Sequence, residues 1–342
     1  MTLRILSIDG GGIRGIIAAR MLEFIQQWLD QPIANYFDLI AGISTGAILA
    51  AGVAIGMSPS ELYQLYLNKG QIIFPYRSWL NPQRISLVFK YGLSAPKFSN
   101  DGLIRVLQEE IGLDKTVADI TSQGMPSNRK LMITSYDTVQ RLPVLFKSWH
   151  PREWYASVPL WEECVCSASA PTYFPAHPLR VRHDQTIITH SMVDGGVGAN
   201  NPTAWAVAEA IQLLRAKQLA KETTPLSLDQ IVNEVSVLSL GTGALLQSLP
   251  WKEVRSWGLI EWAPRIVDVV MDAPNDIYEY ISREIVTKAG TERTQHYLRL
   301  QPELDQKFGA IDNATSAYLK QLTTITDAYL KTQARAIGAF FN

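Results

Sequence analysis

One short stretch constrains the fold of this chain more than any other. An apolar run that begins at Phe37 is typical of a buried strand, and it ends in Gly-x-Ser-x-Gly at residues 42–46. A pattern of small residues follows at once, from Ala47 to Ala51, and predicts a helix. The sequence therefore predicts a strand, a tight turn and a helix, with Ser44 at the tip of the turn.

This geometry suits a serine that acts as a nucleophile. A serine hydroxyl is a weak nucleophile, so it must stand clear of the backbone, near a base and near donors for an oxyanion. Gly42 and Gly46 fit so sharp a turn because a side chain at either position would clash, and Ile43 and Thr45 complete the turn. The motif alone is equally consistent with a plain strand-to-helix turn, so the rest of the chain must supply the partners.

Length, composition and charge narrow the classes of protein. The chain has 342 residues, of which 47% are hydrophobic and 18% charged, so it can bury a large core in one domain or two. The net charge of −1 gives no reason to expect a nucleic-acid partner. Cys164 and Cys166 match neither a disulfide framework nor a metal site, which is typical of a reducing compartment. With no signal peptide and no convincing membrane span, we expect a cytoplasmic protein with peripheral membrane contact.

A second glycine-rich turn follows the strand predicted at Leu3–Ile8. The turn reads Gly10-Gly11-Gly12-Ile13-Arg14-Gly15, and an amphipathic helix follows it. Such a turn directs several backbone N–H groups into one small space at the positive end of a helix. One interpretation is a dinucleotide site, and the other is an oxyanion hole. The dinucleotide interpretation is the weaker, because it requires an acidic residue after the second strand, where this chain has the Ser44 turn.

Strands and helices alternate along the rest of the chain, and this alternation predicts an α/β fold with a mainly parallel central sheet flanked by helices. Further strands are expected at Lys130–Ser135, Val144–Ser148, Thr186–Val193, Val235–Leu240 and Tyr297–Leu300. Helices are expected from Ser58 to about Asn68, at Asp101–Ile111, at Leu160–Ala168, from about Thr203 to Lys217, at Ile266–Asp272 and Ile277–Ile285 with a break or kink at Pro274, and around 318–329. A polar loop is expected over 218–229. We expect one domain over 1–342, with a core at 1–245 and a mainly helical C-terminal completion or cap at 246–342.

Residues 70–100 differ in character from the rest of the chain. Aromatic and aliphatic side chains alternate there with Arg77, Arg84, Lys90 and Lys97, and three prolines interrupt any long element. One interpretation is an irregular excursion packed on the body. The other is a lid or an interfacial surface, in which aromatic and cationic side chains suit a layer of phospholipid head groups.

A nucleophilic serine needs a base, and Asp194 is the better candidate. Of the five histidines (150, 177, 183, 190 and 296), only His296 follows Asp194 in the chain order usual for a triad, and it lies beside a predicted strand. Asp194 ends a strand, and Gly195 and Gly196 let a partner approach closely. Strand ends of an open α/β sheet meet at one crevice, so the glycine-rich turn, Ser44 and Asp194 are expected to meet there. An aspartate acts as a direct base only where the site is partly desolvated.

Three motifs in order carry a resemblance to a known family. Asp9–Gly15, Gly42–Gly46 and Asp194–Gly196 together resemble the patatin-like phospholipase family, with order and spacing in agreement from residue 1 to about 245. Three more stretches are similar: Ser135–Asp137, Ser169–Pro175 and Asn200–Pro202.

The resemblance implies a patatin-like three-layer fold and a Ser-Asp dyad without histidine. Ser44 would attack the ester carbonyl of a lipid, and Asp194 would take the hydroxyl proton and later activate water. The backbone N–H groups of Gly11 and Gly12 would hold the oxyanion. The supporting positions in the glycine-rich loop are Gly10, Ile13, Arg14 and Gly15. The turn around Ser44, here called the elbow, contains Gly42, Ile43, Thr45 and Gly46. Gly195 and Gly196 follow the base. Arg14 would either add a positive field near a phosphate or the oxyanion, or fix the loop through a salt bridge.

We therefore expect a lipid acyl hydrolase of the phospholipase A type, acting on phospholipids or galactolipids at a membrane surface, without metal or other cofactor. The family analogy leaves open an effector of bacterial defence that a nucleotide messenger activates, with a homodimer. A non-catalytic module that binds lipid or nucleotide is the rival from another class, although an intact Ser44 and Asp194 argue against it. A nicotinamide-dependent oxidoreductase is weaker still.

Overall fold

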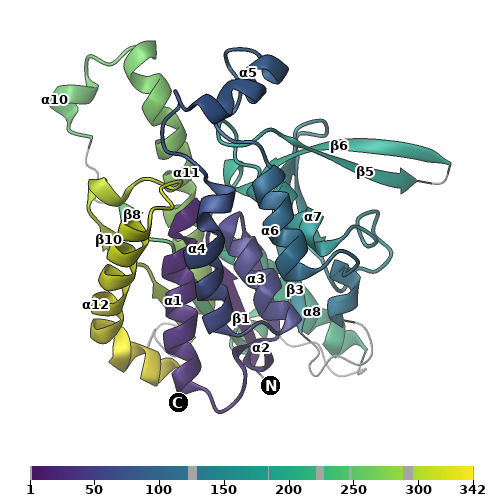
Figure 1. Ribbon diagram of the computed structural model, residues 1–342. Helices are drawn as coiled ribbons and strands as arrows, with labels where there is room; N and C mark the ends of the chain where they lie inside the picture. The colour runs from purple at the N-terminus through teal and green to yellow at the C-terminus, as the bar shows by residue number, and fades with distance from the viewer. Residues whose placement is uncertain are drawn as a thin grey trace.

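The computed structural model describes residues 2–121, 129–183, 185–220, 227–245, 249–287 and 296–341. Within these ranges the central sheet has eight strands, in the order β5-β6-β3-β2-β1-β7-β9, with β4 paired to β3 (Figure 1). The strands are β1 Leu3–Ile8, β2 Leu39–Ile43, β3 Lys130–Asp137, β4 Leu142–Lys147, β5 His177–His183, β6 Thr186–Asp194, β7 Val235–Leu240 and β9 Tyr297–Leu300. A small parallel pair joins β8 Ala244–Leu245 to β10 Glu303–Leu304.

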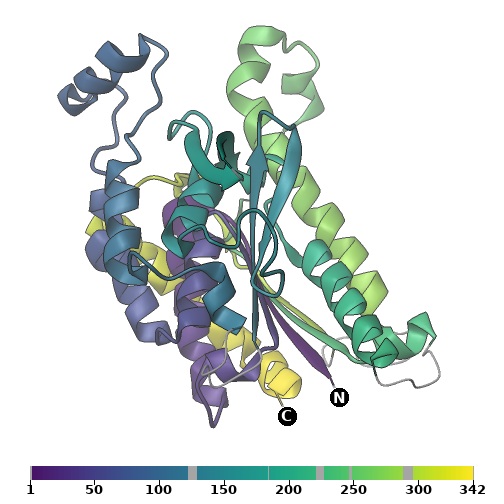
Figure 2. The same cartoon turned by 90° about the vertical axis from the view of Figure 1, so that its right-hand side faces the viewer.

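Helices cover both faces of this sheet, as Figure 2 shows. The helices are α1 Gly15–Ile25, α2 Ile33–Tyr36, α3 Thr45–Ile55, α4 Pro59–Ile73, α5 Ile85–Tyr91, α6 Asp101–Ile111, α7 Leu160–Ala168, α8 Thr203–Leu219, α9 Leu228–Val232, α10 Trp251–Val254, α11 Leu259–Val286 and α12 Ser316–Phe341. The larger hydrophobic core holds α1, α3, α4, α6, α7 and α12 against one face, and α8 packs with the other. The fold is therefore the expected α/β fold, with a mainly parallel sheet between two layers of helices.

The strands at the centre of the sheet are buried on both faces. In β1, Leu6 and Ile8 belong to the larger core, whereas Ile5 belongs to the smaller core on the opposite face. Every residue of β7 is buried. Continuous apolar runs are typical of parallel strands covered on both sides, and for this reason β1, β2 and β7 stand out in the sequence.

Three helices differ clearly from their predicted bounds. The final helix, predicted around 318–329, is longer and runs as α12 over Ser316–Phe341. The helix that begins at Ser58 continues past Asn68 to Ile73, because Gly70 lies against Ile13 and this contact offsets the poor helix propensity of glycine. The helix stops where Pro75 restricts the residue before it. Of the two expectations at Pro274, the separation into two helices is wrong, since α11 runs through that position as one helix of 28 residues, and the kink stays a prediction. A proline removes one main-chain hydrogen bond, and the flanking turns of so long a helix supply the others.

Strand β5 is absent from the sequence prediction. It pairs antiparallel with β6 over seven residue pairs, and the two strands form a hairpin that extends sideways from the body (Figure 1). Charged and apolar residues alternate in β5, so no continuous apolar run marks it. The polar loop expected at 218–229 is shorter than predicted, since α8 reaches Leu219 and α9 begins at Leu228. Residues 221–226 of that loop lie outside the described residues.

The segment 70–100 divides into an anchored base and an exposed tip. Tyr76 and Phe98 are buried in the body, as the first interpretation expects, whereas the short helix α5 and its flanking turns extend from the body (Figure 1). Packing on the body therefore describes only the base. Among the described helices, none is long and apolar enough to cross a membrane.

Candidate active site

Ser44 occupies a strained turn between β2 and α3. Its backbone has φ 55° and ψ −125°, a conformation that side-chain-bearing residues rarely adopt. The Ser44 N–H donates to Ser167 Oγ at 2.8 Å, and the Ser167 hydroxyl donates in turn to the Thr134 carbonyl at 2.6 Å. Such strain persists only where the surroundings determine the conformation, and it places the Ser44 side chain at the tip of the turn.

The two glycines of the elbow are there because backbone passes directly beside them. A Cβ atom on Gly42 would lie 2.2 Å from the Gly46 carbonyl oxygen. A Cβ atom on Gly46 would lie 2.2 Å from the carbonyl oxygen of Ile8, at the end of β1. The first neighbour belongs to the first turn of α3 and the second to β1, so a side chain at either position would displace the turn that carries Ser44.

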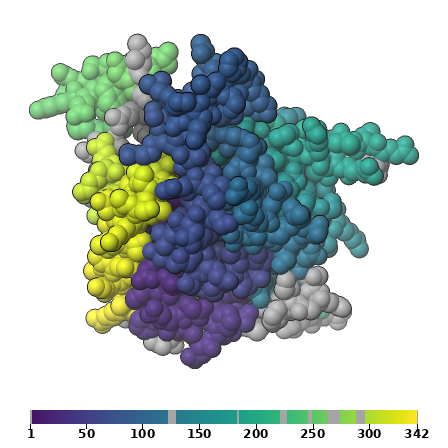
Figure 3. Space-filling model, viewed as in Figure 1, coloured from purple at the N-terminus to yellow at the C-terminus, as the bar shows by residue number. Residues whose placement is uncertain are grey.

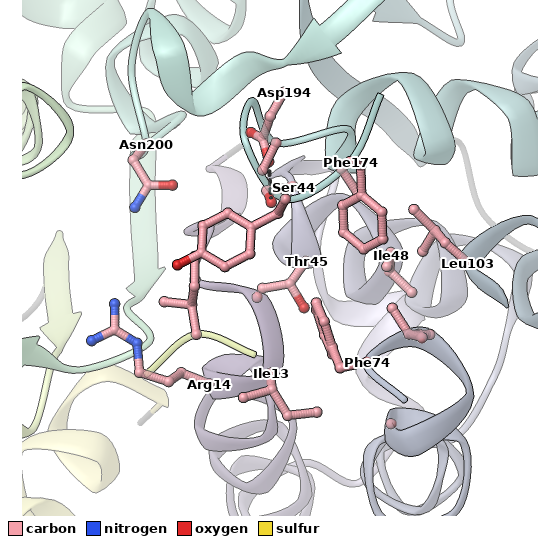
Figure 4. Close-up of a pocket in the computed structure, with 18 of the residues that line it drawn as sticks. Ile13, Arg14, Ser44, Thr45, Ile48, Phe74, Leu103, Phe174, Asp194 and Asn200 are labelled. Atoms are coloured by element: carbon pink, nitrogen blue, oxygen red, sulfur yellow. Dashed lines mark hydrogen bonds between the residues drawn. The ribbon is translucent and has the colours of Figure 1, made fainter. Parts of the chain in front are cut away.

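Asp194 meets Ser44 at the carboxyl end of the sheet. The Ser44 hydroxyl donates to Asp194 Oδ2 at 2.5 Å (Figure 4). The second carboxylate oxygen, Oδ1, accepts from the Gly196 N–H at 2.7 Å, and the Asp194 N–H donates to the Ser169 carbonyl at 3.0 Å. Both carboxylate oxygens and the backbone of Asp194 are thus held, and one oxygen is directed at the serine.

Burial changes the acidity of this carboxyl group. Asp194 is 2% exposed, and the loss of solvent raises its pKa from the ordinary value of 3.8 to about 6. The hydrogen bonds from Ser44 and from the Gly196 backbone act in the opposite direction, because they stabilise the ionised form. A carboxylate with this pKa is a stronger base than an exposed aspartate and is still mostly ionised at neutral pH.

The glycine-rich loop lies directly beside the nucleophile. A Cβ atom on Gly10 would lie 2.0 Å from Asn200 Oδ1 and 3.1 Å from Ser44 Cβ, so a side chain at this position would crowd both residues. The Gly10 carbonyl accepts from Thr242 Oγ1 at 2.5 Å and from Asn200 Nδ2 at 3.3 Å, and the Gly10 N–H donates to the Asn200 carbonyl at 3.1 Å. Residues far away in the sequence therefore fix the first glycine of the loop.

The N–H groups of Gly11 and Gly12 differ from those that follow them. Ile13 N–H donates to the Ile311 carbonyl at 2.7 Å, and Arg14 N–H donates to the Gly11 carbonyl at 3.1 Å. No hydrogen bond from the Gly11 or Gly12 N–H to another described residue is found. Gly11 and Gly12 both line the cavity that Ser44 also lines, where the chain leads into α1 and the helix dipole is positive.

A buried ion pair fixes the loop from the other side of the sheet. Arg299 in β9 donates to Asp9 Oδ2 at 2.5 Å and to Ser239 Oγ in β7 at 2.8 Å. Asp9 is the residue directly before Gly10, and both charged side chains are largely buried. Sequence analysis missed Arg299, although it lies in a predicted strand, because no local pattern connects it to a residue 290 positions earlier.

Ser44 and Asp194 line a cavity of about 540 Å³ whose lining is mostly apolar. The apolar residues of the lining include Ile48, Leu65, Ile73, Phe74, Leu103 and Phe174, together with Ile13, Leu245 and Ile311. In Figure 4, Arg14 and Asn200 lie on one side of Ser44, and Ile48, Phe74, Leu103 and Phe174 lie on the other, whereas the apolar Ile13 lies nearer to Arg14. The volume lies in the range of small-molecule sites, and the apolar lining suits a hydrocarbon chain.

The structure keeps the described histidine side chains away from this cavity. His177 pairs with Glu162 at 2.9 Å, and His190 pairs with Asp137 at 2.8 Å. His296 precedes β9 at the amino end of the sheet, and its carbonyl accepts from Val237 N–H at 2.8 Å. No histidine is among the cavity-lining residues in the described part of the chain, nor do those residues contain three metal-ligating side chains grouped together.

More than half of the chain matches the profile of a known protein family. The profile of the family described as "Patatin-like phospholipase" matches residues 6–207, including the glycine-rich loop, the elbow and Asp194. The chain belongs to the patatin-like phospholipase family. The expected resemblance is therefore confirmed.

Individual relatives cover nearly all of this patatin-like chain. "Patatin-like protein 3" of Arabidopsis thaliana is 27% identical, over 98% of this chain and 82% of that protein. "Probable inactive patatin-3-Kuras 1" of Solanum tuberosum is 28% identical, over 96% of this chain and 86% of that protein. Among solved structures, VipD from Legionella pneumophila matches at 11% identity and a TM-score of 0.37, over 99% of this chain and 88% of that one.

Proposed function

We propose that this patatin-like chain is a lipid acyl hydrolase of the phospholipase A type, with Ser44 as nucleophile and Asp194 as base. The observation that carries the proposal is the 2.5 Å hydrogen bond from the Ser44 hydroxyl to a buried carboxylate, on the wall of a largely apolar cavity. The strained elbow supports it, because strain of this kind is concentrated at functional sites.

The first half of the reaction forms an acyl-enzyme. Ser44 Oγ attacks the ester carbonyl carbon while its proton passes to Asp194 Oδ2, and the carbonyl oxygen becomes an oxyanion. When this intermediate collapses, the ester C–O bond breaks, and the departing oxygen takes the proton from Asp194. The lysolipid leaves, and the acyl group stays on Ser44.

The second half returns the enzyme to its starting state. A water molecule attacks the acyl carbonyl while Asp194 accepts its proton. The new tetrahedral intermediate collapses, the bond to Ser44 Oγ breaks, and Asp194 gives the proton back to the serine. Free fatty acid leaves. One carboxylate thus acts as base and then acid in each half, and a pKa of about 6 suits both roles near neutral pH.

The backbone N–H groups of Gly11 and Gly12 would stabilise the oxyanion in both halves. They lie beside Ser44 on a loop that Thr242, Asn200 and Ile311 hold in place, so they need no rearrangement when charge develops. Preorganised donors of this kind are each worth about 10²–10³ in rate.

The two sides of the cavity suggest how a lipid lies in it. The acyl chain would occupy the side formed by Ile48, Phe74 and Leu103, and the polar remainder would lie toward Arg14. Arg14 is buried on the cavity wall, and both predicted roles stay open for it: a positive field for a phosphate or the oxyanion, or fixing the loop. Phospholipids and galactolipids are both candidate substrates, met at a membrane surface by a peripheral, cytoplasmic protein.

The rival function is a non-catalytic lipid- or nucleotide-binding module. Membership of the family does not exclude it, since one relative is named as probably inactive. The hydrogen-bonded Ser44 and Asp194 of this chain disfavour it, because a pure binding protein needs neither. Activation by a nucleotide messenger, with a homodimer, remains a prediction from the family analogy alone.

Hydrolysis by three proteins tests the proposal: the wild type, Ser44→Ala and Asp194→Asn. The substrates are a p-nitrophenyl ester and mixed phospholipid vesicles. We expect both variants to lose at least about 10³-fold in kcat/KM on both substrates, because each removes a group that acts in every step.

His190→Ala serves as the matched control, because His190 forms a buried pair with Asp137 and lies outside the cavity lining. It should retain activity if it folds, as judged by its melting temperature. A wild type without activity on any ester, or an Asp194→Asn variant as active as the wild type, would contradict the proposal.

A further inference from the structure

The tip of segment 70–100, here called the α5 arm (residues 77–95), exposes large apolar side chains to an unusual degree. Leu80 is 92% exposed, Phe89 88% and Leu93 89%. Ile85 lies one helical turn before Phe89 and is also exposed, so one side of α5 is apolar. Single exposed leucines are common on protein surfaces. A projecting segment with several exposed large apolar side chains is instead typical of a binding surface.

A second apolar projection lies at the start of α11. This segment, here called the α11 tip (residues 251–262), contains α10 and the first turn of α11. Trp251 and Leu259 are both strongly exposed, and Trp257 packs edge-on against Trp262 at 5.3 Å between ring centroids. Tryptophan and leucine side chains of this kind are typical of segments that enter a membrane interface.

The α5 arm and the α11 tip project from the same end of the molecule. In both ribbon views they rise above the carboxyl end of the sheet, and Figure 3 shows them standing above the body (Figures 1 and 2). Ser44 and the cavity lie at that same end, directly after β2. A flat surface that touches both projections therefore faces the end of the molecule where the candidate site lies.

The charge of the arm complements an anionic surface. Between Leu62 and Asn100 the sequence contains five lysines and arginines and no aspartate or glutamate. Lys69 and Lys97 form ion pairs with Glu109 and Asp312 in the body. The three cations that remain belong to the arm: Arg77, Arg84 and Lys90.

Two of these arm cations lie over aromatic rings. Arg84 lies 4.7 Å from the centroid of the Trp79 ring, and Lys90 lies 5.0 Å from that of Tyr91. Cations beside half-exposed aromatic rings suit the head-group layer of a bilayer, where apolar rings and charged groups are accommodated together.

The base of the arm is bonded to the cavity wall. Lys97 N–H donates to the Thr172 carbonyl at 2.9 Å, and Phe98 N–H donates to the Tyr173 carbonyl at 2.7 Å. Thr172 and Tyr173 both line the cavity. Arg84 closes the arm by donating through Nε to the Pro96 carbonyl at 3.3 Å. The arm is therefore a built structure whose position is tied to that of the cavity.

We propose that the α5 arm and the α11 tip form one docking surface for an anionic phospholipid bilayer, with the cavity directed at the lipid. The exposed leucines and aromatic rings would enter the interface, and the arm cations would contact anionic head groups. The docking surface rests on the proposed function and adds to it the surface through which the enzyme reaches its substrate. Its test measures vesicle binding by a catalytically inactive protein, so the docking surface and the proposed function can be disproved separately.

Vesicle binding by the Ser44→Ala protein measures docking without turnover. We compare vesicles of phosphatidylcholine alone with equimolar phosphatidylcholine and phosphatidylglycerol. We expect tighter binding to the anionic vesicles, weakening as salt is added. Replacing Leu80, Phe89 and Leu93 by serine should weaken binding at least tenfold, because each side chain loses apolar area that would leave water.

The matched control is Leu219→Ser with Leu228→Ser. Leu219 is 74% exposed and Leu228 53%, and they lie at the end of α8 and the start of α9, where the chain leads into the amino end of β7. This pair should leave vesicle binding unchanged. A second variant, Arg77→Glu with Lys90→Glu, should weaken binding to the anionic vesicles only and needs no apolar replacement.

Three results would overturn the docking surface. The first is a Ser44→Ala protein that binds neither kind of vesicle. The second is a triple serine variant that binds as tightly as the control pair. The third is self-association of the wild type through the arm, seen as dimers in sedimentation that the serine variant abolishes, without vesicle binding. Hydrolysis of the soluble ester by the serine variant is the separate readout, and it should stay within twofold of the wild type.

Discussion

The candidate active site around Ser44 and Asp194, here called the floor of the cavity, differs from the α5 arm in burial, in polarity and in hydrogen bonding. Ser44 and Asp194 are buried and polar, and each is held by hydrogen bonds from other elements. The arm is exposed and largely apolar, and most of the hydrogen bonds of its tip are local. The difference separates two tasks: bond chemistry in a desolvated, fixed site, and contact with a surface that has no fixed shape.

The two tasks also differ in what a substitution should change. A group that acts on the ester bond should affect the hydrolysis of a soluble ester and of vesicle lipid similarly, because both substrates form the same kind of tetrahedral oxyanion on Ser44. A side chain that contacts the bilayer should affect only the hydrolysis of vesicle lipid. The glycine variant described next is therefore measured on both substrates, and the ratio of the two losses of activity shows which task it affects.

The largest effect after loss of the dyad is expected for Gly12→Ala. Gly12 has φ 58°, and a Cβ atom there would lie 2.2 Å from the Ile311 carbonyl oxygen. The loop must move, and the N–H groups of Gly11 and Gly12 move with it. We expect kcat/KM to fall by about 10²–10³ on the soluble ester and by the same factor on vesicles.

Gly56→Ala is the matched control for that variant. Gly56 also has a positive φ, 93°, but no atom lies within 4 Å of the added Cβ. The backbone strain is similar, so this variant should lose about 1 kcal/mol in stability and keep full activity. If the loss of activity in each variant is proportional to the fall in its melting temperature, the glycine-rich loop has no special role in catalysis. That result would contradict the contrast drawn between the floor and the arm.

A smaller effect is expected from pH. Asp194 must be ionised to accept the serine proton, and its pKa is about 6. The kcat/KM for the soluble ester should therefore rise about tenfold from pH 5 to pH 7 and level off above, because the ionised fraction rises from about 0.1 to 0.9. A midpoint near pH 4 would mean that the carboxyl group is not desolvated.

Vesicle binding measured over the same pH range separates the behaviour of the arm from that of Asp194. Residues 62–100 contain no histidine and no carboxylate, so the arm does not titrate between pH 5 and pH 8. Binding of the Ser44→Ala protein to the anionic vesicles should stay constant while the turnover of the wild type changes. If vesicle binding and turnover both fell at pH 5, the floor and the arm would not be independent.

Much of the floor could be predicted from the sequence because its motifs are local. The apolar runs of β1 and β2 and the glycines beside them mark two strand ends, and parallel strand ends meet at one edge of the sheet. That rule accounts for the meeting of the glycine-rich loop with Ser44. It does not account for Asp194, because β6 is antiparallel to β3, and the 2.5 Å contact with Ser44 depends on how the two strands pair at Ser135 and Asp194.

The supports of the site could not be predicted, because they come from distant residues with common side chains. Thr242, Asn200 and the Ile311 carbonyl fix the glycine-rich loop, and Ser167 holds the backbone of Ser44. No local pattern singles out a threonine or a carbonyl for such a role. Strand β5 was missed for a related reason, since a charged hairpin strand lacks the apolar run that marks a buried one.

The most direct test of the central claim is covalent labelling by a fluorophosphonate, with the modified residue identified by mass spectrometry. The account predicts one adduct, on Ser44, at a rate that falls at least about 10²-fold in Asp194→Asn and is unchanged in the triple serine variant of the arm. Labelling at another serine, or equal rates for wild type and Asp194→Asn, would contradict the claim that this pair performs the chemistry.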